Sequence, residues 1–235
     1  KKGRAGKTRF DAHLSTSLGQ VSQFMDLMDT QQYLEVRREG VSNDGLDGFL
    51  GVPAYDFYWP DITLWDQDRY TDWQRELLGG TEYRNNAQLS VSGGSERTQF
   101  LVSGAFLKET TVFPGDANYK RANVHSNINH RSDNDRFRLN LSTSYSQEDN
   151  LLPRSDLSFQ AYTLAPNAPA LFDEDGNLNW ENNTWDNPLA ALEEKFGVKT
   201  RTVLANALIS YELVKDLEVR ASMGYTDYSL DSYRT

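Results

Sequence analysis

The sequence predicts an all-β protein: a segment of a transmembrane antiparallel β-barrel with long loops that contain short helices. Three observations lead to this prediction. Apolar and polar residues alternate with period two in seven separate stretches, as in strands with one apolar and one polar face. The connections between these stretches are alternately short and long. Aromatic residues stand at the ends of several apolar faces, as they do at the edges of a membrane-spanning barrel.

Each of the seven stretches is defined by the residues of its apolar parity. The clearest is Asp135–Asn150, in which every second residue from Phe137 to Tyr145 is apolar or Thr, while Arg, Asn and Ser occupy the other parity. In chain order the apolar sets are Phe10, Ala12, Leu14 and Leu18; Ala87, Leu89 and Val91; Phe100, Val102 and Phe106; Ala122, Val124 and Ile128; Phe137, Leu139, Leu141 and Tyr145; Val203, Ala205, Ala207, Ile209 and Tyr211; and Leu217, Val219, Ala221, Met223 and Tyr225.

The connections indicate that the two ends of the sheet differ. Tight hairpin turns are expected at Gly93–Arg97, Ser132–Asp135 and Val214–Asp216. The other connections are roughly 65, 10 and 50 residues long, against a usual median of about 4–6. The two longest, at about residues 19–85 and 147–200, are expected to be extracellular loops. Short turns at one end and long loops at the other are the organisation of an outer-membrane barrel.

The spacing of aromatic residues favours the same interpretation. Phe137 and Tyr145 bracket the apolar face of the fifth stretch. At about 3.3 Å per residue and a tilt near 40°, they are separated by about 20 Å along the membrane normal, close to the ~25 Å apolar band of such barrels. Lipid outside and water inside is therefore favoured. The alternative is a soluble β-sandwich binding module with aromatic residues at its strand ends by chance.

Composition excludes several classes of protein. The 235-residue chain has a net charge of −10, which argues against a nucleic-acid partner. It has no cysteine, and therefore no disulfide, thiol catalysis or zinc–thiolate site. No apolar run is long enough for a spanning helix, although barrel strands give a much weaker signal. Since the sequence starts without an initiator methionine or a signal-peptide core, an upstream part is expected.

Several separated segments resemble the SusC/RagA-type TonB-dependent outer-membrane transporters of Bacteroidetes. The resemblance covers nearly the whole chain, and the order of the segments makes it specific. The segments are Lys1–Ser15, Thr71–Leu78, Asn86–Glu109, Tyr119–Ile128, Arg136–Ser146, Leu164–Leu178 and Asn187–Glu194.

The resemblance implies a barrel of about 22 strands that is closed by a plug domain. Residues 1–6 would be the end of the plug and residues 7–235 the N-terminal third of the barrel, in the outer membrane of a Gram-negative bacterium. Seven strands leave two open edges, so the chain is expected to be a fragment of a larger protein. The implied partners are a SusD-like lipoprotein, the TonB complex and outer-membrane lipid. The implied cargo is a large nutrient, with oligosaccharides expected and peptides as the alternative.

The polar parity of the strands supplies the candidate lumen-facing or plug-facing residues. Mixed charge on an inner wall can bind a plug by hydrogen bonds and stay wetted. The alternative is that these residues only hold the plug or pair across strands. The set is Arg9, Asp11, His13, Asn123, His125, Asn127, Arg136, Arg138, Asn140 and Arg220.

All five tryptophans fall in the two long loops: Trp59, Trp65, Trp73, Trp180 and Trp185. Exposed aromatic side chains could anchor a partner protein or stack on sugar rings, and of these two roles partner contact is expected because the loops are long. The alternative is that they form small cores within their own loops.

The remaining motifs are weaker. Asp173, Asp175, Asn177 and Asn179 have the spacing of calcium ligands, but Leu178 replaces the glycine of an EF-hand and a turn at Asp175-Gly176 is a simpler explanation. Short helices are expected at Met28–Gly40, with Asp29 or Thr30 as N-cap and Gly40 as the stop, and within Asp156–Pro166. We expect no cofactor, no metal and no enzymatic activity, because no catalytic motif occurs and the three histidines lack metal-ligand spacing.

Overall fold

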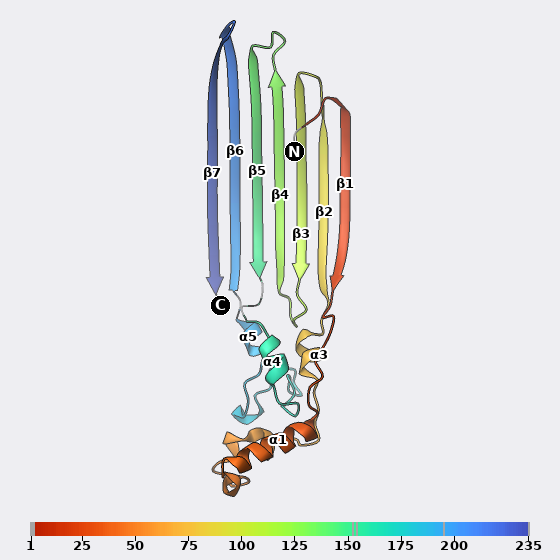
Figure 1. The fold of residues 1–235 in the computed structure, drawn as a ribbon, viewed down its shortest axis with the longest axis vertical. Helices are drawn as coiled ribbons and strands as arrows, with labels where there is room; N and C mark the ends of the chain where they lie inside the picture. Colours follow the sequence, from red (N-terminus) through yellow and green to blue (C-terminus); the bar gives the residue numbers. More distant parts are fainter. Residues whose placement is uncertain (1–2, 152, 154, 195, 235) are drawn as a thin grey trace.

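Seven strands form one antiparallel sheet in a computed structural model that describes residues 3–151, 153, 155–194 and 196–234. Each strand pairs with its neighbour along the chain, and the seven predicted strands are confirmed (Figure 1). They are β1 (Gly6–Gly19), β2 (Glu82–Gly94), β3 (Thr98–Thr110), β4 (Asn118–Arg131), β5 (Phe137–Leu151), β6 (Phe196–Val214) and β7 (Leu217–Arg234).

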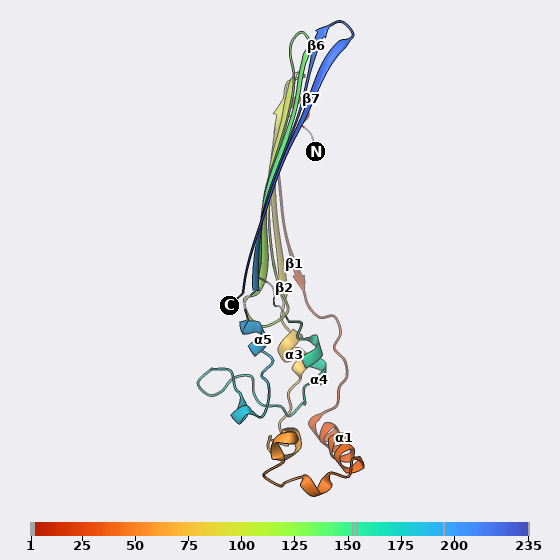
Figure 2. The same ribbon diagram turned by 90° about the vertical axis from the view of Figure 1, so that its left-hand side faces the viewer.

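The sheet is a single curved layer, as the side view in Figure 2 shows. β1 and β7 are its two edges. The soluble β-sandwich is therefore wrong as an alternative, because a sandwich needs a second sheet to cover one face and all seven strands belong to one sheet.

As predicted, the short connections lie at one end of the sheet and the long connections at the other. Residues 95–97, 132–136 and 215–216 make the short turns, and the long connections gather at the opposite end (Figure 1). Asp216 has a φ of 69°, a left-handed conformation that Asp tolerates better than most residues. This allows β6 and β7 to be joined by two residues.

The long connections contain short helices. They are α1 (Thr30–Asn43), α2 (Pro60–Thr63), α3 (Trp73–Leu78), α4 (Ser158–Thr163) and α5 (Ala190–Glu193), with 3-10 turns at Asp47–Phe49, Asp56–Tyr58 and Glu181–Asn183. In the part of the chain that the structure describes, none of these helices has the length and apolar character needed to cross a bilayer.

Helix α1 begins as predicted and ends later. The Asp29 carboxylate accepts a hydrogen bond from the Gln32 amide, and the Gln32 side chain accepts one from the Asp29 amide, which makes a capping box. The predicted stop at Gly40 is wrong, because the helix continues to Asn43. An exposed glycine costs a helix only about 1 kcal/mol, and burial of Val41 in the next position offsets that cost.

The hydrophobic core lies in the loops and not in the sheet. Trp73, Leu77 and Leu78 of α3 pack against Leu157 and Ala161 around α4, together with Ala165, Ala168, Trp185 and Leu189. We call the described parts of residues 20–81 and 152–195 the cap. Two loops that are far apart in the sequence therefore fold as one unit at the long-loop end of the sheet (Figures 1 and 2).

Candidate functional site

One face of the sheet collects all seven apolar sets. Directly opposed residues of an antiparallel pair lie on the same face, so the registers show which residues share it. One row across the sheet reads Phe10, Val91, Val102, Ser126, Thr143, Ala205 and Tyr225. The six registers join the apolar parities without a conflict. We call this side the apolar face and the other side the polar face.

The aromatic residues that bound the apolar face lie on a diagonal across the sheet. Near the long loops this boundary runs from Tyr83 on β2 to Tyr225 on β7. Asn85 and Asp231 lie in one row across the sheet, so Tyr83 is level with the position two residues after Asp231 on β7. Tyr225 lies eight residues before that position, so the boundary shifts by eight residues toward the short turns over five strand pairings. Near the short turns it runs from Phe10 on β1 to Tyr211 on β6, a shift of six residues over five pairings.

These shifts give the inclination of the apolar band to the strands. Five pairings span about 24 Å at ~4.8 Å each, and six to eight residues span about 20–26 Å at ~3.3 Å each. The edges of the band can therefore lie parallel to a membrane plane only if the strands are tilted by about 40–48° from the membrane normal. Strands of outer-membrane barrels are tilted by about 35–45°.

The polar face carries nine of the ten residues predicted to face a lumen or plug. Nine lie on strands, and Arg136 lies in the turn before β5, where its carbonyl accepts a hydrogen bond from the Glu212 amide. Several fall in common rows: Arg9 with Asn127, Asp11 with His125, His13 with Asn123, and Arg138 with Arg220. The face is thus a wall of amides, hydroxyls and charged groups.

An asparagine ladder connects β4 and β5 on the polar face. Asn140 Nδ2 donates to Asn129 Oδ1 at 2.7 Å, and Asn129 Nδ2 donates to Asn127 Oδ1 at 2.8 Å. Asn127 Nδ2 donates to the Leu141 carbonyl at 3.2 Å. These bonds fix the amide orientations, so two of the ten predicted residues, Asn127 and Asn140, have a structural role in this wall.

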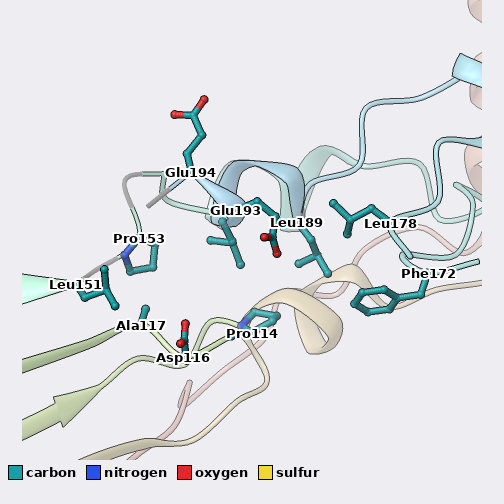
Figure 3. Close-up of a pocket in the computed structure, with 12 residues that line it drawn as sticks. Pro114, Asp116, Ala117, Leu151, Pro153, Phe172, Leu178, Leu189, Glu193 and Glu194 are labelled. Atoms are coloured by element: carbon teal, nitrogen blue, oxygen red, sulfur yellow. The ribbon is translucent and has the colours of Figure 1, made fainter. Parts of the chain in front are cut away.

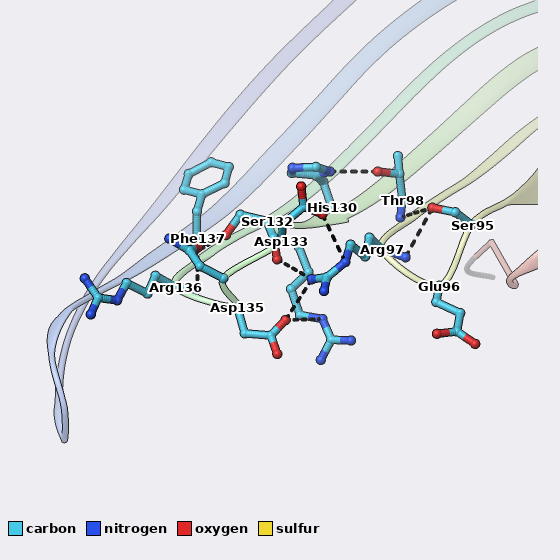
Figure 4. Close-up of polar contacts among 12 residues, drawn as sticks. Ser95, Glu96, Arg97, Thr98, His130, Ser132, Asp133, Asp135, Arg136 and Phe137 are labelled. Carbon is cyan, nitrogen blue, oxygen red and sulfur yellow. Dashed lines mark hydrogen bonds and ion pairs between the residues drawn. The ribbon is translucent and has the colours of Figure 1, made fainter.

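An arginine clasp joins two neighbouring short turns (Figure 4). Arg97 forms ion pairs of 3.1 Å with both Asp133 and Asp135 and donates to the Ser132 carbonyl. Arg131 pairs with Asp135 at 3.2 Å. Beside the clasp, a hollow of about 540 Å³ on the sheet is lined by side chains that include Arg138, Arg220 and Glu218. Sequence reasoning found Arg138 and Arg220 but not the clasp, because its members belong to two separate turns.

In the cap, Asp61 is the centre of a buried polar cluster. Its carboxylate accepts hydrogen bonds from Tyr33 Oη at 2.9 Å and from Arg37 Nε at 2.7 Å. Asn167 Nδ2 donates to the Asp61 carbonyl at 2.8 Å, which ties the third long connection to the first. Burial, followed by the charge of Asp61, raises the pKa of Tyr33 to about 12.

Two of the tryptophans belong to the core of the cap and not to its surface. Trp73 and Trp185 are 4% and 7% exposed, with ring centroids 5.9 Å apart. Trp73 Nε1 donates to the Ala165 carbonyl and Trp185 Nε1 to the Asn179 carbonyl. Their burial leaves no free ring for the expected partner contact, and the two rings pack in one core shared by both loops, not in small cores within their own loops.

The other three tryptophans differ in their surroundings. Trp65 packs partly buried against the same core, and its Nε1 donates to Thr184 Oγ1. Trp180 is 45% exposed, and the ring centroid of Trp59 lies 6.0 Å from that of Tyr58. Contact with a partner or substrate stays a prediction for these three.

An exposed aromatic cluster lies beside Trp59, and sequence reasoning missed it. Phe57 and Tyr58 are 59% and 61% exposed, with ring centroids 4.1 Å apart. The ring centroid of Tyr55 lies 6.4 Å from that of Tyr58 and 4.9 Å from that of Phe49, so Tyr55 connects Phe49 to the pair. We call Phe49, Tyr55, Phe57 and Tyr58 the aromatic patch. The run of apolar residues from Phe49 to Trp59 was the signal that could have found it.

The calcium candidate folds as a turn. The Asp173 carboxylate accepts hydrogen bonds from the amides of Asp175 and Asn177, and Gly176 has a φ of 82°. An isolated bridge between Phe172 and Leu178 closes this hairpin. Among the described residues, no group of His, Cys, Asp and Glu is arranged to hold a metal.

A second hollow, of about 210 Å³, lies between the β3–β4 connection and the cap (Figure 3). Pro114, Leu151, Phe172, Leu178 and Leu189 give it apolar walls. Asp116, Glu193 and Glu194 also line it, and the Glu194 carboxylate points away from the hollow and pairs with Arg234 at 3.0 Å. It could accept a small apolar group next to a cationic one.

The chain is similar to known proteins in sequence and in fold. It is 26% identical over 239 residues to TonB-dependent receptor P3 of Formosa agariphila, a match that covers 96% of this chain and 22% of the relative. No family model matches. Two structures of the RagAB peptide importer, in its closed-closed and open-open states, superpose with TM-scores of 0.74 and 0.75 at 18% identity, over 100% of this chain and 29% of theirs.

These likenesses confirm the predicted resemblance to the TonB-dependent outer-membrane transporters and the fold of a barrel segment. The chain spans about a fifth of the length of its curated relative and under a third of the solved chains. Its open edges at β1 and β7 agree with a segment of a larger barrel.

Proposed function

We propose that this chain is the N-terminal part of the barrel of a SusC-like, TonB-dependent outer-membrane transporter that imports a large nutrient. The observation that carries the proposal is the diagonal apolar band. A band inclined at the barrel tilt becomes level when the sheet curves into a closed barrel, and its outer surface then contacts lipid. The polar face would line the lumen.

The short-turn end of the polar face would contact the plug. Residues 1–6 would be the end of that plug, and Gly3 supports the assignment. A Cβ at Gly3 would lie 2.6 Å from the Phe100 backbone, so the chain before β1 passes directly against β3. The ten lumen-facing residues would then hold the plug or stay wetted, without covalent chemistry.

Residues 20–81 of the cap would meet a SusD-like lipoprotein, while the TonB complex supplies energy through another part of the protein. Residues 20–81 contain twelve Asp and Glu and four Lys and Arg, a net charge of −8 out of −10 for the chain. The aromatic patch lies in this acidic loop, and exposed Tyr, Phe and Trp are enriched in protein interfaces. A docking face of the lipoprotein with an apolar centre and a basic rim would fit it.

Oligosaccharides are the proposed cargo. The polar face is rich in neutral amides and hydroxyls, such as Ser90, Ser103, Asn123 and Ser144, and these groups suit neutral polyhydroxylated molecules. Peptides are the second candidate, because the solved structures of similar fold are of a peptide importer.

The test is uptake by cells that lack the gene for the whole protein, complemented with the full-length protein. Labelled oligosaccharides and labelled peptides would be supplied separately, with and without dissipation of the proton gradient. Energy-dependent uptake of oligosaccharides that requires the protein is the expected result. Uptake of peptides alone would select the second candidate, and uptake of neither, by a protein confirmed in the outer membrane, would contradict both.

A further inference from the structure

We infer that the apolar face carries, just beyond its lipid band, a binding site for a phosphate-bearing lipid headgroup, centred on Lys108 and Lys120. The inference rests on the proposed function, because it requires this face to contact a bilayer. It adds a specific anionic ligand on the long-loop side, where a barrel of this kind meets the outer leaflet.

Position is the first observation. Beyond the last apolar residue of β3, Phe106, the next residue on the apolar face is Lys108. Beyond Ala122 on β4 it is Lys120, and beyond Val203 on β6 it is Arg201. On each of these three strands a cation therefore lies two residues beyond the last apolar residue, which is about 5 Å further along the membrane normal at a tilt near 44°. Headgroup phosphates lie at this depth, and Lys and Arg side chains reach toward them while their stems stay on apolar surface.

Charge pairing is the second observation. Lys108 and Lys120 lie directly opposite each other across β3 and β4, an arrangement of like charges that is destabilising unless an anion lies between them. Neither forms an ion pair within the described ranges. Asp149 stands next to Lys120 in the same row and supplies one negative charge.

The polar face at the same level is different. There Arg84 pairs with Glu109 at 2.9 Å, and Arg121 pairs with Glu148 at 3.5 Å. On the apolar face, Arg201 pairs with Asp231 at 3.2 Å and is neutralised by it. The proposed site is therefore centred on the two lysines, and Arg201 lies at its edge. The chain thus pairs its inner arginines itself. On the apolar face of the described strands, the one carboxylate beside the two lysines, Asp149, lies between Lys120 and Lys199, so this part of the row keeps a net positive charge that an external anion can neutralise.

The third observation is an asymmetry between the two ends of the apolar face. At the short-turn end, the described residues that follow the band on this face include Thr98 and His130, and none of them is Lys or Arg. The cations near these turns, such as Arg138 and Arg220, lie on the polar face. An anionic headgroup is therefore expected at the long-loop side alone.

The experiment measures lipid retention by the purified full-length transporter with native mass spectrometry. The probes are lipid A, phosphatidylethanolamine, and inorganic phosphate as competitor. We expect selective retention of lipid A, and a loss of apparent affinity of about 30-fold in the double variant Lys108→Gln/Lys120→Gln, from the usual contribution of two lysines near an anionic surface. The charge-preserving Lys108→Arg/Lys120→Arg variant should retain the lipid, and so should Lys215→Gln, which removes a lysine in the turn at the opposite end.

Equal retention by the double Gln variant and the wild type would overturn the inference, as would an equal loss in Lys215→Gln. Displacement of lipid A by millimolar inorganic phosphate would assign the lysines to free phosphate and would also overturn it. Heat-modifiable migration on a gel confirms that each variant is a folded barrel. A wild type that shows no heat-modifiable barrel would instead contradict the proposed function, so the two failures are distinguishable.

Discussion

Tyr33, Arg37 and Asp61 show at the scale of single residues how the cap is held together. Asp61 is buried, and its carboxylate is satisfied by a phenol and a guanidinium from α1 while its carbonyl accepts from Asn167. Because a buried carboxylate without partners is costly, these three contacts fix α1 and the two long loops relative to one another.

The raised pKa of Tyr33 leads to a prediction on pH dependence. Its folded-state pKa of about 12 lies above the ordinary value of 10, so the native cap favours the neutral phenol. The stabilisation is fully present below pH 10 and is lost as the pH rises through 12. Absorbance titration of the wild type and Tyr33→Phe should give a difference curve with a midpoint near the higher value. A midpoint near 10 would show that Asp61 and burial do not act on this phenol.

For single residues, the sequence predicted on which face of the sheet a side chain lies, but not whether a side chain in a loop is buried. Period two places Asn127 and Asn140 on the polar side correctly, because parity depends only on the strand. Burial of Trp73 and Trp185 depends on the packing together of two loops that are separated by about 70 residues of sequence, for which local patterns carry no signal. The Asp61 cluster was missed for the same reason.

At the scale of elements, the existence of the seven strands and their two faces followed from the sequence, while the strand ends did not. β7 was expected over about 217–226 and continues to Arg234. Alternation ends near Tyr225 because a strand that leaves the apolar band no longer needs an apolar side, although its backbone ladder to β6 continues. Hydrophobic pattern therefore reports the extent of the apolar band and not the length of the strand.

Strand β5 supplies a test of the two faces. Leu141 lies at the middle of the band and Ser142 on the polar face. Leu141→Arg is expected to lower the free energy of unfolding of the full barrel by ~2–4 kcal/mol, and Ser142→Arg by much less, because only the first places a charge in lipid. Urea titration in detergent or lipid would measure both. Equal losses would count against the assignment of the faces.

The aromatic patch makes a prediction about the first long loop. Phe57→Ala and Tyr58→Ala in the full-length protein are each expected to weaken binding of the proposed SusD-like lipoprotein by about 2 kcal/mol, as exposed aromatic hot spots do. Phe159→Ala in α4 is the matched control, because Phe159 is 73% exposed and lies outside the patch. Binding would be measured by interferometry with the purified lipoprotein. The same affinity in all three variants would remove the patch from the interface.

At the scale of the whole molecule, the sheet and the cap are built on opposite principles. The cap has a dry core of its own, whereas the sheet leaves large apolar side chains such as Phe10, Leu14 and Leu89 more than 60% exposed on one face. A free-standing soluble protein rarely exposes so large an apolar surface. The apolar band crosses the strands at the tilt of an outer-membrane barrel, so the exposed side chains are explained if this face is the outside of such a barrel.

The fold class, the seven strands with their short turns, and the two faces were accessible from sequence because each depends on a local period or a turn. The joint cap, the arginine clasp and the aromatic patch were not, because each depends on contacts between connections. The cargo stays a proposal, because the chain covers 22% of the curated relative and 29% of the solved chains.

The central claim, lipid on the apolar face and water on the polar face, is tested most directly by cysteine scanning of β5. The chain has no native cysteine, so each residue from Phe137 to Ser146 can be replaced singly in the full-length protein, in membranes, without background labelling. A water-soluble maleimide should label the even-numbered positions, and a lipid-dissolved nitroxide should quench a probe attached at the odd-numbered ones. Labelling without this alternation, or with the two parities reversed, would contradict the account.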